Sequence, residues 1–152
     1  MEILEKLKKI RGAEAALGIT LLSKEICEAR LPVGAKLLGY TDSLYFCYVE
    51  GYLETVFAVD DISEQEWKSW PIAYDTCEFV KLILSCADAE LAARSSFMDE
   101  SAFRVALNKG NEMTNRKLQN ICATLSLEPI EDPYRYTHTI IQLLDCSRVI
   151  RK

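Results

Sequence analysis

The sequence predicts one α+β domain over residues 1–152, in which a mixed or antiparallel sheet is flanked by helices and the C-terminal half is helix-rich. Two observations predict this class. Aromatic and β-branched runs cluster between residues 43 and 59, whereas helical periodicity dominates beyond residue 76. Strands that precede helices, without alternating with them, are typical of α+β folds. A chain of 152 residues is long enough for one ordinary core.

A short amphipathic helix is predicted at the start of the chain and is expected to end near Gly12. Its apolar residues recur at helical spacing between charged residues: Ile3, Leu4, Leu7 and Ile10. The segment 13–39 has no clear pattern, and a second short helix after Ser23 is one interpretation. Three residues are then expected to interrupt regular structure: Pro32, Gly34 and Gly39.

A β-hairpin is predicted next. The stretches SLYFCYV (43–49) and LETVFAV (53–59) have strand composition, and Glu50 with Gly51 supplies a turn between them. Both faces of the first stretch are apolar or aromatic. We therefore expect its strand to be covered on both sides, with a helix on at least one of them.

The second strand is expected to end at Asp60 and Asp61. Ser63 and Glu66 then have capping-box spacing, which predicts a short helical turn that carries Trp67.

The apolar run from Cys77 to Ala87 predicts the central core helix, after a short strand at 71–74. The run is too short to span a bilayer, which needs about 20 apolar residues. Asp75 and Glu78 have the capping-box spacing, so the helix is expected to begin at Thr76. Its few polar positions fall on one stripe, which predicts burial on the other sides: Glu78, Lys81 and Ser85.

Three further helices are predicted. Residues 99–110 form the first, closed by Gly110, and residues 118–125 carry the apolar face of the second. Asp132 caps the third with Pro133 at its first position. The apolar face of that last helix is expected to comprise Tyr136, Ile140, Leu143 and Leu144.

Charge and cysteine content indicate which partners, compartment and cofactors to expect. The 23 acidic and 18 basic residues give a net charge of −5, which disfavours direct nucleic-acid binding and favours a basic partner. The opening MEILEKLKKI does not resemble a secretory leader, so we expect a cytoplasmic protein without membrane contact. The six cysteines are therefore expected to be reduced thiols. Without Cys-x-x-Cys spacing and with His138 as the sole histidine, no metal or other cofactor is predicted.

No catalytic residue is predicted. Phosphate-binding glycine loops and the GxSxG and HExxH motifs do not occur in the sequence. His138 lacks a nucleophile motif around it and is interpreted as a surface or interface residue. Cys77 lies at a helix start, where a thiol pKa can fall, but its apolar neighbourhood favours simple packing.

The segment DDISEQEW (60–67) is the densest carboxylate cluster. A Mg²⁺ or Ca²⁺ site, a solvated helix start and an acidic partner surface are all compatible with it. The helix start is favoured, because the segment lacks the EF-hand loop pattern. Trp70 and Tyr74 beyond the segment suit either a core or an interface. The residues predicted as possible partner contacts are Asp60, Asp61, Glu64, Glu66 and Trp67.

The ordered stretches VFAVDDI, WPIAYDTCEFVKLILSCADA, FMDESAF and EPIEDPYRY resemble the SUKH superfamily. This superfamily includes fungal cell-wall-synthesis regulators and many bacterial immunity proteins. The resemblance extends from Tyr48 to the C-terminus, and its most specific part is the Pro-Ile-Ala strand end followed by the Leu-Ile-Leu helix. The N-terminal part departs from the family pattern, because Leu31-Pro32 is followed by Val33-Gly34 and no Asn-Gly turn follows.

The resemblance implies a mixed sheet flanked by helices, no catalysis and a protein partner, which in bacterial members is often a polymorphic toxin and frequently a nuclease. Our hypothesis is a cytoplasmic bacterial immunity protein that neutralises a cognate, basic toxin by stoichiometric binding. A regulatory or scaffold protein of the cell-wall-synthesis-regulator type is the alternative. A small metal-dependent hydrolase that uses the carboxylates of residues 60–66 is a third possibility. Both a monomer and a homodimer are compatible with the sequence.

Overall fold

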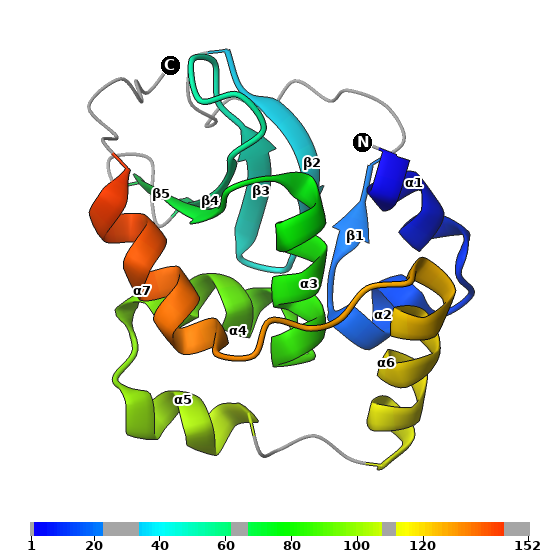
Figure 1. Ribbon diagram of the computed structural model, residues 1–152. Helices are drawn as coiled ribbons and strands as arrows, with labels where there is room; N and C mark the ends of the chain where they lie inside the picture. The colour runs from blue at the N-terminus through cyan, green and yellow to red at the C-terminus, as the bar shows by residue number, and fades with distance from the viewer. Residues whose placement is uncertain (1, 23–33, 62–66, 108–111, 145–152) are drawn as a thin grey trace.

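The computed structural model describes residues 2–22, 34–61, 67–107 and 112–144, and it has the predicted α+β class (Figure 1). Its elements, in chain order, are α1 (Glu2–Lys9), α2 (Ala13–Leu17), β1 (Thr20–Leu21), β2 (Lys36–Tyr40), β3 (Leu44–Tyr48), β4 (Val56–Asp61), β5 (Trp67–Ala73), α3 (Thr76–Cys86), α4 (Ala89–Arg94), the 3₁₀ helix η1 (Ser95–Phe97), α5 (Glu100–Leu107), α6 (Glu112–Leu125) and α7 (Pro133–Leu143).

The strands form one antiparallel sheet in the order β1-β2-β3-β4-β5. Each strand therefore pairs with its neighbour in the sequence. The predicted hairpin is confirmed, because β3 and β4 pair with Phe46 opposite Ala58. Of the two predicted kinds of sheet, the antiparallel one is observed.

Two local predictions are wrong. Gly39 does not interrupt regular structure but lies inside β2, next to a register shift between Leu37 and Gly39. A Cβ atom at Gly39 would lie 2.7 Å from the Thr20 carbonyl oxygen, so glycine allows β1 to approach β2. Trp67 does not belong to a helical turn, since it pairs with Asp61 and begins β5. The strand predicted from Pro71 therefore begins at Trp67.

The central helix α3 follows its prediction closely. The Asp75 side chain caps it, with Oδ1 accepting a hydrogen bond from the Glu78 amide at 2.7 Å. The helix begins at Thr76, as expected. Its polar stripe is half-buried, whereas seven residues elsewhere on the helix are buried: Thr76, Phe79, Val80, Leu82, Ile83, Leu84 and Cys86.

Both faces of β3 are buried, which confirms the expectation for this strand. Phe46 points into the main core, where its ring lies 5.2 Å from that of Phe79 on α3. Cys47 belongs to a second apolar cluster with Leu37, Phe57 and other residues. Figure 1 shows α3 crossing in front of the sheet, with α7 beside β5 and α1 on the opposite side.

The three predicted C-terminal helices are present as α5, α6 and α7, and Asp132 caps α7 by accepting from the Arg135 amide at 3.1 Å. Leu143 departs from the predicted apolar face, because 70% of its surface is exposed. The short helices α2, α4 and η1 were not predicted. The predicted helix after Ser23 lies outside the described residues. Every helix within the described ranges falls short of the length and apolarity that crossing a bilayer requires.

Candidate partner-binding surface

The predicted contact residues meet where β4 ends and β5 begins. Asp60 and Asp61 are the last residues of β4, and Trp67 pairs with Asp61. Glu64 and Glu66 lie outside the described residues. The Asp60 side chain is only 18% exposed and accepts a hydrogen bond from Arg94 Nη1 at 3.0 Å. Asp60 therefore holds the fold together, and its predicted role as a partner contact stays a prediction.

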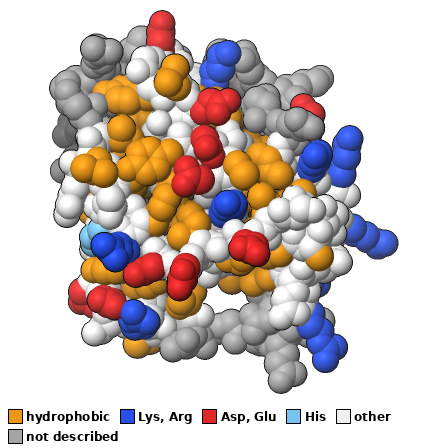
Figure 2. Space-filling view, viewed as in Figure 1, with side chains coloured by type: hydrophobic (Ala, Val, Ile, Leu, Met, Phe, Trp, Pro, Cys, Tyr) orange, Lys and Arg blue, Asp and Glu red, His pale blue; other side chains and the backbone are white. Residues whose placement is uncertain are grey.

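Acidic side chains occur on several parts of the surface. On the face in Figure 2, they run over the upper half of α3, with hydrophobic side chains on both sides. Acidity alone therefore does not single out a binding surface. Concavity is the stronger criterion, because a hollow focuses the electric field of the charges that line it.

Two adjoining hollows, with volumes of about 520 and 590 Å³, lie around the β2–β3 turn. They share Tyr40, Thr41 and Asp42, so they adjoin the same turn. Their charged residues, as far as the structure describes the lining, are all carboxylates. We call the two hollows together the acidic surface and define it by these five carboxylates: Glu14, Asp42, Asp60, Asp88 and Glu90.

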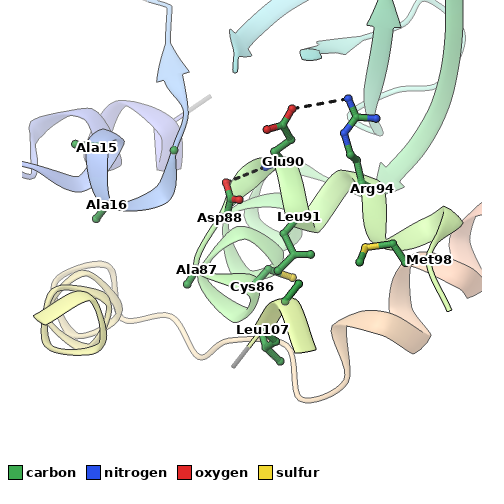
Figure 3. A pocket seen from close by; sticks show the side chains of 12 residues that line it. Ala15, Ala16, Cys86, Ala87, Asp88, Glu90, Leu91, Arg94, Met98 and Leu107 are labelled. Carbon is green, nitrogen blue, oxygen red and sulfur yellow. Dashed lines mark hydrogen bonds and ion pairs between the residues drawn. The ribbon is translucent and has the colours of Figure 1, made fainter. Parts of the chain in front are cut away.

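An apolar groove of about 750 Å³ adjoins the acidic surface and shares Asp88 and Glu90 with it (Figure 3). Asp88 caps α4, because its Oδ1 accepts from the Glu90 amide at 3.2 Å. A Cβ atom at Gly18 would lie 2.8 Å from this oxygen. Gly18 has φ 68°, so a glycine both ends α2 and lets α2 approach the start of α4.

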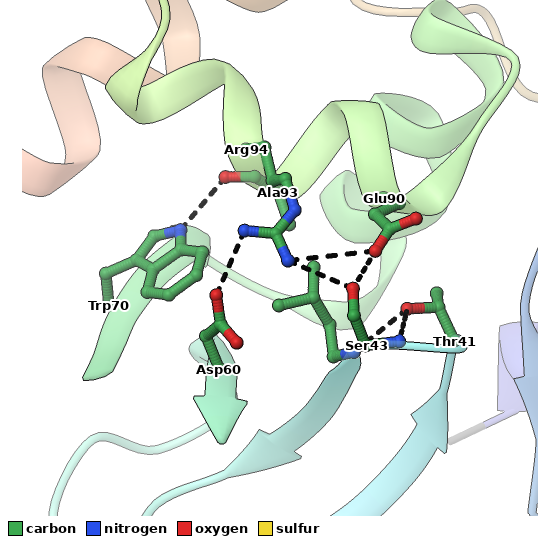
Figure 4. Close-up of polar contacts among 8 residues, drawn as sticks. Thr41, Ser43, Asp60, Trp70, Glu90, Ala93 and Arg94 are labelled. Carbon is green, nitrogen blue, oxygen red and sulfur yellow. Dashed lines mark hydrogen bonds and ion pairs between the residues drawn. The ribbon is translucent and has the colours of Figure 1, made fainter. Parts of the chain in front are cut away.

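Arg94 connects the carboxylates to the strands (Figure 4). Its Nη2 donates to Ser43 Oγ at 3.0 Å and lies 3.7 Å from Glu90 Oε1. Ser43 also donates to Glu90, while Thr41 Oγ1 accepts from the Ser43 amide at 3.4 Å. Together with the Asp60 contact, these bonds attach α4 to the β2–β3 turn and to the end of β4. Asp60 and Glu90 are thus held in position before any partner binds.

Trp70 anchors the same region from inside the core. Its indole Nε1 donates to the Ala93 carbonyl at 3.0 Å, and only 3% of its surface is exposed. The Phe97 ring lies edge-on, with 4.9 Å between the ring centres. Of the two roles considered for Trp70, the core role is the one observed. Tyr74 is 39% exposed, and its ring contacts Tyr136.

The described thiols and the imidazole occupy structural positions. Burial raises the pKa of Cys47 and of Cys86 to about 12, which keeps both in the unreactive thiol form at neutral pH. Cys77 is half-buried in the first turn of α3. His138 Nε2 lies 2.9 Å from the Ser95 carbonyl oxygen, and its ring is 4.1 Å from that of Tyr134. The His138 contacts tie α7 to η1.

Among the described residues, no three potential ligands come close enough to hold a metal ion. Sequence reasoning found Asp60 but missed the other four members of the same surface: Glu14, Asp42, Asp88 and Glu90. One local signal was available, since Asp88 followed by Glu90 is a helix-start pattern. The pattern predicts the start of a helix, but it does not show that this helix packs beside the β2–β3 turn, because that depends on tertiary contacts.

The arrangement is suited to binding cations. A carboxylate accepts hydrogen bonds at both oxygens, so Glu14, whose Oε1 accepts from the Leu21 amide at 2.7 Å, can also bind a cationic group. The same holds for Asp88, and Asp42 is exposed in the turn. Comparison of the chain with family models, curated proteins and solved structures finds no match.

Proposed function

We propose that the protein is a SUKH-type immunity protein that binds a basic protein toxin, with a nuclease as the favoured class, and neutralises it stoichiometrically in the cytoplasm. One observation carries the proposal: the acidic surface is concave and gathers five carboxylates around the β2–β3 turn and helix α4. A basic protrusion of a partner would find a complementary shape and potential there.

Complementary potentials mainly raise the association rate and the specificity of a complex. The nucleic-acid-binding cleft of a nuclease is basic because it binds phosphates. An acidic protein that covers such a site blocks its substrate without any chemistry. Arg94 fixes Asp60 and Glu90 in advance, so less side-chain freedom is lost on binding.

Two further observations support the proposal. The resemblance of residues 48–152 to the SUKH superfamily implies a protein partner and no catalysis. The cysteines with described side chains, Cys47, Cys77, Cys86 and Cys122, are free thiols, which suits a reducing compartment.

The test is affinity capture from the native cells with two charge-neutralised baits. The first bait is Asp42→Asn, Asp88→Asn and Glu90→Gln, which removes three charges from the acidic surface. Asn caps a helix about as well as Asp, so α4 keeps its start. The matched bait is Glu5→Gln, Glu128→Gln and Glu131→Gln, which removes the same charge from exposed positions elsewhere. We expect a basic, one-to-one partner that the matched bait retains and the first bait binds about tenfold more weakly, because rim charges govern association.

The captured partner is then expressed in a new host with and without the protein. We expect growth arrest by the partner alone and rescue by coexpression. Equal capture by both baits would contradict the role of the acidic surface. A harmless partner, such as a wall-synthesis or signalling protein, would refute the immunity function and favour the regulatory alternative.

A further inference from the structure

The groove beside the acidic surface is lined mostly by apolar side chains. It lies between α2, the junction of α3 and α4, and α5, and Figure 3 shows Leu91, Met98 and Leu107 around it. Its apolar lining is completed by small residues and one buried thiol: Ala15, Ala16, Cys86, Ala87 and Ala106. The groove has a volume of about 750 Å³ and is open to the surface.

Charged groups of the groove lie along one side. Asp88, Glu90 and Arg94 are its charged lining residues within the described chain, and Figure 3 shows them together at the start and end of α4. Arg94 is paired with Asp60 and lies near Glu90, so its charge is compensated. Asp88 and Glu90 also belong to the acidic surface. The groove therefore combines an apolar lining with a negative edge that continues into the acidic surface.

The apolar lining and the negative edge together restrict what can bind in the groove. A second copy of the chain docked through the same groove by a two-fold axis would bring two negative edges into one interface, and like charges disfavour such a contact. A purely apolar segment would leave Asp88 without a cationic partner, whereas Glu90 already has Arg94 at 3.7 Å. A segment with apolar side chains on one face and lysine or arginine beside them complements both the apolar lining and the negative edge.

We propose that the groove binds an amphipathic basic helix of the partner, with its apolar side chains against Leu91, Met98 and Leu107 and its cations on Asp88 and Glu90. This inference rests on the proposed function, since it describes how the same partner is held. Met98 suits the role, because a flexible thioether adapts to different apolar shapes.

The test uses a fluorescein-labelled peptide of leucine and lysine, about 18 residues long and amphipathic as a helix, which gives about five turns. Two matched peptides replace either every leucine by serine or every lysine by glutamate. Binding is measured by fluorescence polarisation.

In parallel, the Met98 methyl signal is followed by NMR in protein labelled at its three methionines. The signal is assigned with the variant Met98→Leu. We expect the leucine-lysine peptide to bind at least about tenfold more tightly than either matched peptide, and to shift the Met98 signal.

Variants of the full chain locate the binding. Ala15→Trp fills the groove from an exposed position on α2, whereas Ala102→Trp places the same side chain on an exposed position of α5 that does not line it. We expect Ala15→Trp to weaken binding about tenfold, because the apolar contacts are lost, and Ala102→Trp to leave it unchanged. Circular dichroism confirms that both variants are folded.

Two failures are distinguishable. If the serine-lysine peptide binds as tightly as the leucine-lysine peptide, and the triple variant Asp42→Asn, Asp88→Asn and Glu90→Gln weakens both, the acidic surface binds cations but the groove inference is wrong. If no peptide is sensitive to the triple variant, the charge argument behind the proposed function fails as well. Unchanged binding in Ala15→Trp, or a static Met98 signal, also overturns the groove inference.

Discussion

Phe79→Ala is expected to lower the free energy of unfolding by about 3–5 kcal/mol, the usual cost of removing a buried phenylalanine. Phe79 is fully buried in the first turn of α3, and its ring packs on Phe46 from β3. Its removal leaves a cavity between the helix layer and the sheet. Because natural domains are stable by about 5–15 kcal/mol, the variant should lose a large fraction of its stability. Urea titration followed by circular dichroism measures the change.

Lys81→Ala provides the control on the same helix. Lys81 lies on the half-buried polar stripe of α3, so its truncation should change stability by no more than about 0.5 kcal/mol. Equal effects of the two substitutions would mean that α3 is not oriented with Phe79 toward the sheet.

The stability of the protein should fall steeply above pH 9. Burial raises the pKa of Cys47 and of Cys86 from 9.0 to about 12. Between these two values the unfolded chain releases the thiol protons, whereas the folded chain retains them. The stabilisation is therefore complete below pH 9 and is lost as the pH rises toward 12. Each thiol should contribute a slope of about −1.4 kcal/mol per pH unit, measured by urea unfolding at a series of pH values.

The double variant Cys47→Ala and Cys86→Ala isolates this effect. Its stability at pH 7 will be lower, because two small buried groups are removed, but the informative quantity is the slope above pH 9. A weaker slope should remain, since burial also raises the pKa of Tyr48 and Tyr136. An unchanged slope in the double variant would show that the two thiols are not buried in the folded state.

The parts of the fold that could be predicted from the sequence are those specified locally. Asp75 and Glu78 define the start of α3 by themselves, and the spacing of Lys81 and Ser85 identifies its half-buried polar stripe. The composition of residues 43–49 likewise identified a strand buried on both faces. In these cases a few neighbouring residues determine both the hydrogen bonds and the burial of the element.

The parts that could not be predicted depend on contacts between distant residues. Helix α4 is short and rich in alanine, and it is positioned by the Trp70 bond to Ala93 and by the Arg94 bonds to Asp60 and Ser43. Ladder pairing with Asp61 places Trp67 in a strand despite the helix-start pattern before it. The acidic surface was missed for the same reason, since its carboxylates come from separate parts of the sequence.

The most direct test of stoichiometric neutralisation is a titration of the captured partner's toxic activity with increasing amounts of the protein. A constant amount of partner is mixed with the protein, and the remaining activity is measured after short and long incubation. Our account predicts a linear loss that ends at one equivalent, is independent of incubation time and shifts to higher concentrations at high salt. Complete and progressive loss at well below one equivalent would mean that the protein inactivates its partner catalytically, and would contradict the account.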